Sequence, residues 1–431
     1  MKKSGYLTFV ALLFVFCIFC GPLKLYFRGA VFFATFLTFG YMLTIAPQLL
    51  FGKATFLAAL LFCIKIGTDI IFGGTLTTNS AYKYTCDIIL MPIVSYGLLT
   101  LFLKNGDYRS FKRYTMVSCL ILLVFVLATI RADVGASRNS ITQAMQYSVS
   151  AVIDAYEDAK TGVLGYQSIH ALPFLIPGLV MLYKNGWNAA VKWGSAIYAG
   201  LLMLAIVRSG FTMASIVALL VLLFCMVRTS GRSSSQFILI CTLVLVLLAW
   251  KCGFIASGLK MILMETTERN AITSKMSEIV AVYEKEERGS SDANSRIDMI
   301  KVVTKAFVKH PVFGHSFNEE GACGHNYILD YLAQYGMFGF FFFWYYYYFV
   351  FKSVKTVMPK SMYWHYNLAF VALIVMLCLK AQALKVQNVV GFLMLPSLLL
   401  YGEEAFYFAS NRVRARFGLP PVKGEFYGDD I

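Results

Sequence analysis

The sequence predicts an all-α polytopic membrane protein with about twelve transmembrane helices and a helical outer loop between the ninth and tenth of them. Of the 431 residues, 58% are hydrophobic and only 14% are charged. A soluble globular chain is about 45–50% apolar and about 25% charged. The apolar residues fall into blocks of roughly 17–25, the length that crosses the hydrocarbon core of a bilayer. Helices are the spanning form that such blocks imply, because a helix satisfies its own backbone hydrogen bonds.

The candidate spans follow one another along the chain. They lie near residues 6–20, 30–51, 54–73, 86–103, 114–130, 168–183, 188–207, 211–227, 236–256, 326–351, 365–380 and 386–408. The first block has a basic start but no small-x-small cleavage site, so we expect a span there and not a cleaved signal peptide. The chain then divides into 1–256 with spans one to nine, 257–324 as the long outer loop, and 325–431 with spans ten to twelve and a basic cytoplasmic tail.

The connecting loops alternate in charge, and this alternation predicts the side of the membrane that each occupies. One set is rich in Lys and Arg: "MKK", "KNGDYRSFKR", "RTSGRSSSQ", "KSVKTVMPK" and the tail "NRVRARFGLPPVKG". Basic loops stay in the cytoplasm. We therefore expect both termini inside, and the segments 131–167 and 257–324 outside. The net charge of +15 is thereby explained by orientation, and no basic run interleaved with aromatic residues predicts nucleic-acid binding.

The long outer segment is expected to contain two helices. Apolar residues recur at helical spacing over 272–283, and "GSSDANS" then interrupts the pattern. Ser295 followed by Asp298 is a variant capping box that opens a second helix, which Pro311 ends.

Polar residues gather where the tenth span begins, in "GHNYILDYLAQYGMFG". Asn326, Asp330 and Gln334 are spaced by four, so they form a stripe on one face of an apolar helix. A carboxylate at membrane depth is costly, so the stripe should face protein or water and not lipid. His325 stands beside it. Although a histidine at a helix start is more often structural, it has the pKa range of a general base.

Two arginines on the outer side are candidate anion ligands. Arg296 occupies the first turn of the second outer helix, and Arg208 lies in a very short turn between two spans. Each also has an ordinary interpretation, as a solvated or a snorkelling arginine. No metal-ligand cluster and no Walker motif is present in the sequence. The pattern therefore suits chemistry with an anionic leaving group and a histidine base, with neither metal nor cofactor.

The segment "HNYILDYLAQYGMFG", from His325, resembles the signature of the O-antigen ligase and polymerase superfamily. "SRIDMIKVVTKAFVKHPVFGHS", from Ser295 to Ser316, is similar to the outer-loop segment of that family, in which an Arg opens a helix that closes in His-Pro-apolar-apolar-Gly. "VRSGFTMA", from Val207, resembles the turn after the family's seventh span, with the order of Arg and Ser altered. The resemblance covers roughly residues 200–340 and, in the first half of the chain, extends only to topology.

The resemblance implies a membrane glycosyltransferase that takes a glycan from undecaprenyl diphosphate on the outer, periplasmic face of the bacterial cytoplasmic membrane. It implies His325 as the base that activates the acceptor hydroxyl, with Arg296 and Arg208 holding the donor diphosphate. His315 is a candidate supporting residue, as are the stripe residues. Gln334 stands where many members of the family carry Glu. Asp330 is a nearby carboxylate that can substitute for this Glu.

Several alternatives remain open. The acceptor is another lipid-linked repeat for a polymerase, lipid A core for a ligase, or a protein. A lipid-linked oligosaccharide flippase or polysaccharide exporter is the alternative function, and it predicts charges along several spans. Lys65 and Asp69 are the best such pair, which we interpret as structural. A membrane protein with only an assembly role is the third class. Cys252 and Cys323 flank the long loop and are a candidate disulfide.

Overall fold

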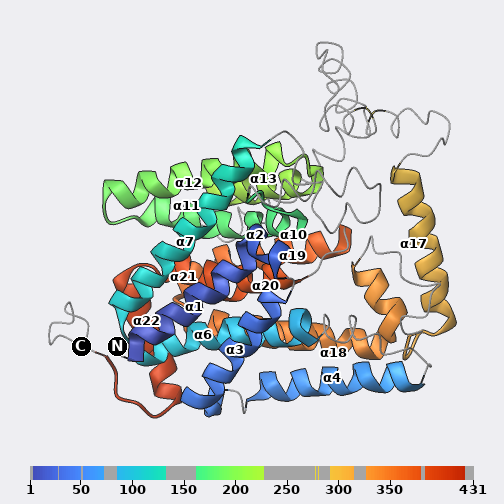
Figure 1. Ribbon diagram of the computed structural model, residues 1–431, viewed down its shortest axis with the longest axis horizontal. Helices are drawn as coiled ribbons and strands as arrows, with labels where there is room; N and C mark the ends of the chain where they lie inside the picture. The colour runs from blue at the N-terminus through green and yellow to red at the C-terminus, as the bar shows by residue number, and fades with distance from the viewer. Residues whose placement is uncertain are drawn as a thin grey trace.

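The computed structural model describes residues 3–27, 29–49, 52–71, 85–132, 162–227, 277, 280, 292–314, 327–379 and 384–422. Within these ranges the secondary structure is helical throughout and contains no strand, which confirms the all-α class. Most of the helices lie side by side with their axes across the view in Figure 1, and α17 (Asp292–Lys309) crosses one end of this bundle.

The long helices follow the apolar blocks of the sequence. They are α1 (Lys3–Phe19), α3 (Ala30–Ile45), α4 (Lys53–Ile71), α6 (Met91–Asn105), α7 (Tyr108–Arg131), α11 (Ile176–Asn185), α12 (Ala189–Arg208), α13 (Thr212–Val227), α18 (Tyr327–Val357) and α19 (Tyr363–Leu379). The shorter elements are α2 (Gly21–Tyr26), η1 (Pro47–Leu49), the π-helix η2 (Thr85–Leu90), α10 (Tyr166–Ala171), η4 (Leu172–Leu175), η5 (Lys360–Met362), α20 (Lys385–Val389), the π-helix η6 (Val390–Met394), α21 (Leu395–Leu399) and α22 (Glu403–Arg416).

The number of membrane spans remains a prediction. By length and composition, three of the described helices can cross a membrane: 87–105, Tyr108–Arg131 and Ala189–Arg208. A fourth is added if the bent pair Lys385–Leu399 and Glu403–Arg416 counts as one span, and four further apolar helices are shorter. The predicted ninth span, 236–256, lies outside the described residues.

The outward faces of the bundle are apolar. Phe56, Val124 and Ile197 are each at least 60% exposed, on three different helices. Inside, rings pack closely, as where Phe351 stacks on Phe370 with ring centroids 4.0 Å apart. Extensive exposed apolar surface is unusual in soluble monomers, so these helices suit a membrane-associated protein.

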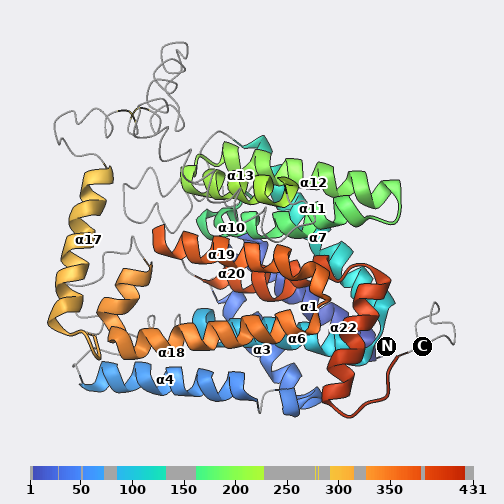
Figure 2. The ribbon, with the colours of Figure 1, turned by 180° about the vertical axis from the view of Figure 1, so that it is seen from behind.

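Basic loops meet at one end of the bundle. Lys184, at the end of α11, donates a hydrogen bond to the carbonyl of Cys225 near the end of α13. Arg414 of α22 donates to the carbonyl of Lys104, the next-to-last residue of α6, at 2.8 Å. The described termini of the chain lie at this same end (Figure 2). The arrangement agrees with the loop alternation, which requires the basic loops to share one side.

The predicted last span, 386–408, is broken in the structure. Its helix ends at Leu399, and the axis turns by 120° into α22. α22 begins with Glu403 and Glu404 and ends with Arg414 and Arg416, so it is too polar to continue through hydrocarbon. Its arginines instead reach carbonyls at the carboxyl ends of neighbouring helices, where cations are favoured.

Candidate functional site

The structure describes only part of the predicted site. His325, Asn326 and His315 lie outside the described residues, and Arg296 is placed as a backbone position in the second turn of α17. Asp330 and Gln334 lie in the first part of α18, and both side chains are buried. This burial is what a polar stripe turned away from lipid requires.

Two glycines join the end of α17 to α18. Gly314 follows α17 with φ of +76°, and Gly336 interrupts α18 with φ of +63°. These left-handed angles favour glycine. A Cβ on Gly336 would stand 2.3 Å from the carbonyl oxygen of Val312, and one on Gly314 would stand 2.4 Å from the backbone of Gln334. Both glycines therefore allow two backbone segments to touch where no other residue fits.

The same two segments are hydrogen bonded through their backbones. The amide of Met337 donates to the carbonyl of Pro311 at 2.8 Å, and the amide of Phe338 donates to that of Val312 at 3.1 Å. The kink at Gly336 frees these amides, because a helix broken there cannot bond them to its own preceding turn. The α17–α18 junction, residues 310–314 with 334–338, is thus a backbone-to-backbone contact.

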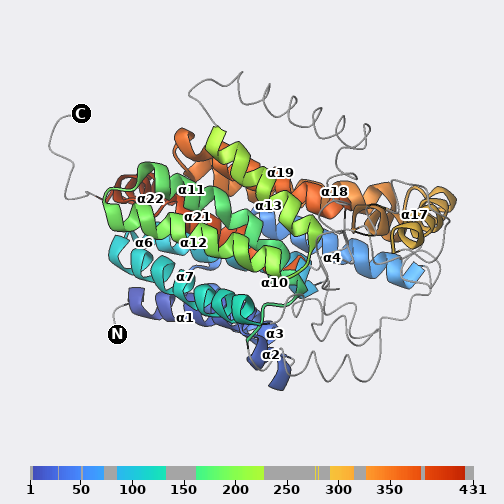
Figure 3. The same ribbon diagram turned by 90° about the horizontal axis from the view of Figure 1, so that it is seen from above.

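Apolar packing continues from the junction back along α17 and the first part of α18. Val303, Ala306 and Ala333 form a small buried cluster, against which Phe307 and Leu329 pack. Val303 precedes Pro311 by eight residues, and Leu329 precedes Met337 by eight. The two helices therefore pack against each other along their lengths at one end of the bundle (Figure 1 and Figure 3).

This packing brings the candidate segments into one part of the molecule. Arg296 lies seven residues before Val303, or about 10 Å along α17. α18 begins at Tyr327, two residues before Leu329. The structure thus unites the segment carrying Arg296 and the helix that follows His325 in one packed unit.

Arg208 lies at the same end of the bundle as α17. It ends α12, which starts at the end with the basic loops and runs to the other. Its Nη2 donates to the carbonyl of Ala132, the C-cap of α7, at 3.0 Å. Its Nε is buried without a hydrogen-bond partner among the described residues. The guanidinium is thus held by one hydrogen bond and retains donors for an anion.

A buried polar junction inside the bundle was missed by the sequence analysis. Asp87 and Asn388 are buried, and the Nζ of Lys385 lies 3.4 Å from Oδ1 of Asp87. The Nδ2 of Asn388 donates to the backbone carbonyl of Asp87 at 2.6 Å and to the hydroxyl of Tyr347 at 3.0 Å. A signal was present, because Asp87 and Asn388 both fall inside predicted spans, where polar residues are costly.

The junction joins the π-helix η2 to α20, the helix that leads into the second π-helix, η6. η2 contains Asp87, and η6 begins two residues after Asn388. A π-helix leaves backbone groups without their usual partners and is frequent at functional sites. Here Tyr346 donates its hydroxyl proton to the carbonyl of Ile89 at 2.7 Å.

This contact belongs to the aromatic run "FFFFWYYYYFVF", residues 340–351 of α18. Tyr346 and Tyr347 are buried in the bundle because their hydroxyls find acceptors there. Tyr345 and Tyr348 of the same run face outward and are exposed.

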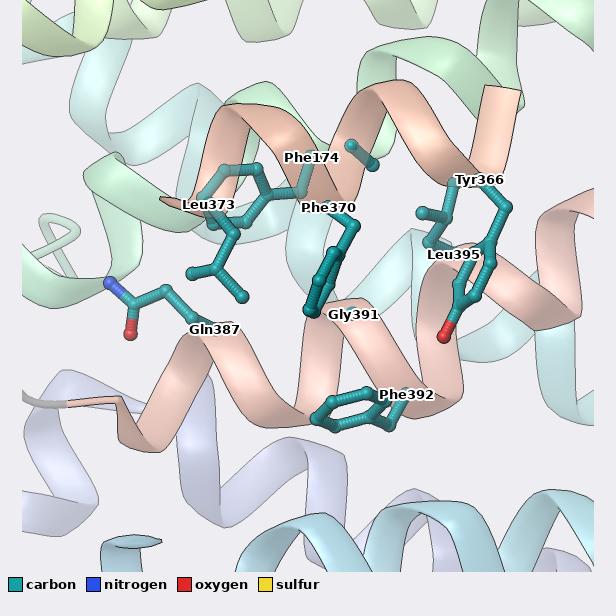
Figure 4. Close-up of a pocket in the computed structure, with 9 residues that line it drawn as sticks. Phe174, Tyr366, Phe370, Leu373, Gln387, Gly391, Phe392 and Leu395 are labelled. Carbon is teal, nitrogen blue, oxygen red and sulfur yellow. The ribbon is translucent and has the colours of Figure 1, made fainter. Parts of the chain in front are cut away.

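A small, partly open hollow lies beside this junction between α19 and η6 (Figure 4). Phe174, Phe370, Phe392 and Leu395 line it, and Gln387 stands at one edge. Gln387 itself donates to the carbonyl of Gln167 in α10 at 3.4 Å. The lining is almost wholly apolar, so the hollow suits hydrocarbon and not a sugar.

Comparison with known proteins adds no assignment. No protein-family model and no curated protein matches the chain. Among the residues that the structure describes, no group of three His, Cys, Asp or Glu side chains is placed to hold a metal ion. Function is therefore inferred from the residues and their arrangement.

Proposed function

We propose that the protein is a membrane glycosyltransferase of the O-antigen ligase or polymerase type, acting at the periplasmic face of a bacterial cytoplasmic membrane. Its donor is a glycan on undecaprenyl diphosphate, and its acceptor is a hydroxyl of another glycan or of lipid A core. The observation that carries the proposal is the α17–α18 junction. It joins the two segments that resemble the family, 295–316 and 325–339, through contacts that tolerate only glycine.

The proposed step breaks the bond between the donor sugar and its diphosphate and forms a bond from that sugar to the acceptor oxygen. His325 takes the proton of the acceptor hydroxyl. Arg296 and Arg208 hold the diphosphate, which leaves as undecaprenyl diphosphate. Arginine suits this role because it stays charged and binds phosphate oxygens in pairs. The supporting residues Asn326, Asp330, Gln334 and His315 orient the base and the acceptor.

The depth of the α17–α18 junction supports this assignment. After the kink, the apolar stretch Met337–Phe351 contains 15 residues and is about 22 Å long, and the basic loop "KSVKTVMPK" follows it. With this loop at the cytoplasmic surface of a hydrocarbon core of about 30 Å, the kink lies in the outer leaflet. The kink is therefore close to the membrane boundary at which the diphosphate of a lipid-linked donor must also lie.

The ion pair of buried Asp87 with the partly exposed Lys385 is the observation that favours the alternative, a lipid-linked oligosaccharide flippase or polysaccharide exporter. A transport path needs polar groups along several spans. The described polar contacts of Asn388 instead cross-link η2, α18 and α20 through specific hydrogen bonds. Such a cross-link suits a fixed scaffold better than an open path, so we retain the transferase as the proposal.

A deletion strain tests the proposal and separates its versions. Surface glycans and lipid-linked intermediates are compared with those of the parent strain. Loss of long chains identifies a polymerase, and long chains that remain on the carrier identify a ligase. Accumulation of finished precursor on the cytoplasmic side supports the exporter and contradicts the transferase. Restoration by the wild-type gene but not by His325→Ala ties the phenotype to the proposed base.

A further inference from the structure

The outward side of the α17–α18 junction carries a patch of exposed apolar side chains. These are Val312 at 55%, Phe313 at 53%, Met337 at 54%, Phe338 at 44% and Phe341 at 65%. They are contiguous, because Phe313 and Phe338 meet edge to face with centroids 5.7 Å apart. We call this set the junction patch. Exposed apolar patches of this kind mark surfaces that meet a partner or a membrane.

The junction patch continues the outward face of α18. Phe341 is followed by Tyr345 and Tyr348, which are also exposed and stand at helical spacing. This face has the pattern of a helix side in contact with lipid, with tyrosines toward the other membrane surface. Phe313 and Val312 extend the same face beyond the kink, although they belong to the turn after α17.

The length of α18 after the kink places the junction patch near a membrane boundary. The apolar stretch Met337–Phe351 is about 22 Å long, which is less than a hydrocarbon core of about 30 Å. With the basic end of this stretch at the cytoplasmic surface, the residues beside the kink lie about 8 Å inside the outer boundary of the core.

The charges on α17 complement a lipid surface. Lys301, Lys305 and Lys309 are exposed and spaced by four, so they form a row along α17. The row lies on the side away from the cluster around Val303. An amphipathic element that pairs exposed apolar residues with lysines lies in the plane of a bilayer interface.

We infer that the turn Pro311–Phe313, together with Met337 and Phe338, inserts into the lipid leaflet at this end of the bundle. The occupant of the junction patch is the acyl region of the bilayer itself, entered to a depth of about 5–10 Å. Insertion fixes α17 on the membrane surface, and with it the height of Arg296. This inference rests on burial and packing and holds whether or not the protein transfers glycans.

Fluorescence quenching in lipid nanodiscs tests the inference. An environment-sensitive fluorescent amino acid replaces Phe313 in the full chain, and Val312 in a second variant. Lys305, exposed on α17, receives the probe as a control. Thermal unfolding and size-exclusion chromatography confirm that each labelled protein is folded.

The probe at 313 should emit at shorter wavelength than the probe at 305. It should lose most of its emission in lipids brominated near the glycerol backbone, and little with aqueous iodide. The probe at 305 should show the reverse. Quenching of the 313 and 312 probes by iodide would place the patch in water, and quenching by neither agent would place it against protein. Either result overturns the inference, and neither bears on glycan transfer.

Discussion

Replacing Gly336 by alanine should open the α17–α18 junction. An L-residue in the left-handed region costs roughly 1–2 kcal/mol. The new Cβ would also stand 2.3 Å from Val312 O and 2.6 Å from Gly314 N, both backbone atoms that have no side-chain freedom to yield. Relief requires loss of the hydrogen bonds from Met337 and Phe338, each contributing about 0.5–1.5 kcal/mol. Backbone strain and the two lost hydrogen bonds together destabilise the closed junction by about 2–5 kcal/mol. The ratio of closed to open junction therefore falls by roughly 30-fold to several thousand-fold.

Amide hydrogen exchange followed by mass spectrometry measures this opening. In Gly336→Ala, exchange at Met337 and Phe338 should accelerate, and glycan transfer should fall in parallel. Gly200→Ala is the matched control, since nothing lies within 4 Å of its Cβ position in α12; we expect it to keep exchange and transfer unchanged. Wild-type protection in a folded Gly336→Ala protein would refute the reasoning about this contact. If Gly336→Ala fails to fold, Gly314→Ala provides the same comparison from the other side of the junction.

Three further predictions concern other parts of the account. Asn388→Ala should lower the free energy of unfolding by about 1–3 kcal/mol, because the buried carbonyl of Asp87 and the hydroxyl of Tyr347 lose their hydrogen-bond donor. An unchanged denaturation midpoint would show that the polar junction contributes nothing to stability. Arg208→Lys should weaken binding of undecaprenyl diphosphate by losing the planar fork while keeping the charge, whereas Arg131→Lys on the exposed neighbouring helix end should bind as the wild type does. Transfer by the purified protein should survive EDTA, and activity lost to EDTA and restored by magnesium would contradict the metal-independent mechanism.

The sequence was sufficient for features that depend on local composition. The apolar blocks located the helices, and Pro311 marked the end of the second outer helix close to its observed end at Lys309. The spacing of Asp330 and Gln334 was enough to predict that the two share one face of a helix that packs against protein, and both are buried. These inferences hold because helix periodicity and the cost of burying charge act within a few residues.

Features that depend on distant contacts were not predictable. Asn388 reaches Asp87 across 301 residues of sequence, and no local pattern indicates that pairing. Two glycines of the signature look alike in sequence, yet Gly336 has a left-handed φ and Gly339 does not. The break after Leu399 was missed because the apolar run continues to Tyr401, and only the polar helix beyond it shows where the span ends.

Transfer by the purified protein is the most direct test of the central claim. The protein in nanodiscs receives undecaprenyl-diphosphate-linked glycan and an acceptor, and product is followed for wild type, His325→Ala and the control His310→Ala. The account predicts that His325→Ala lowers transfer by about 10²–10⁴-fold and still binds undecaprenyl diphosphate, while His310→Ala, at the exposed end of α17, transfers normally. Full transfer by His325→Ala, or no transfer by the wild type from this donor, would contradict the account.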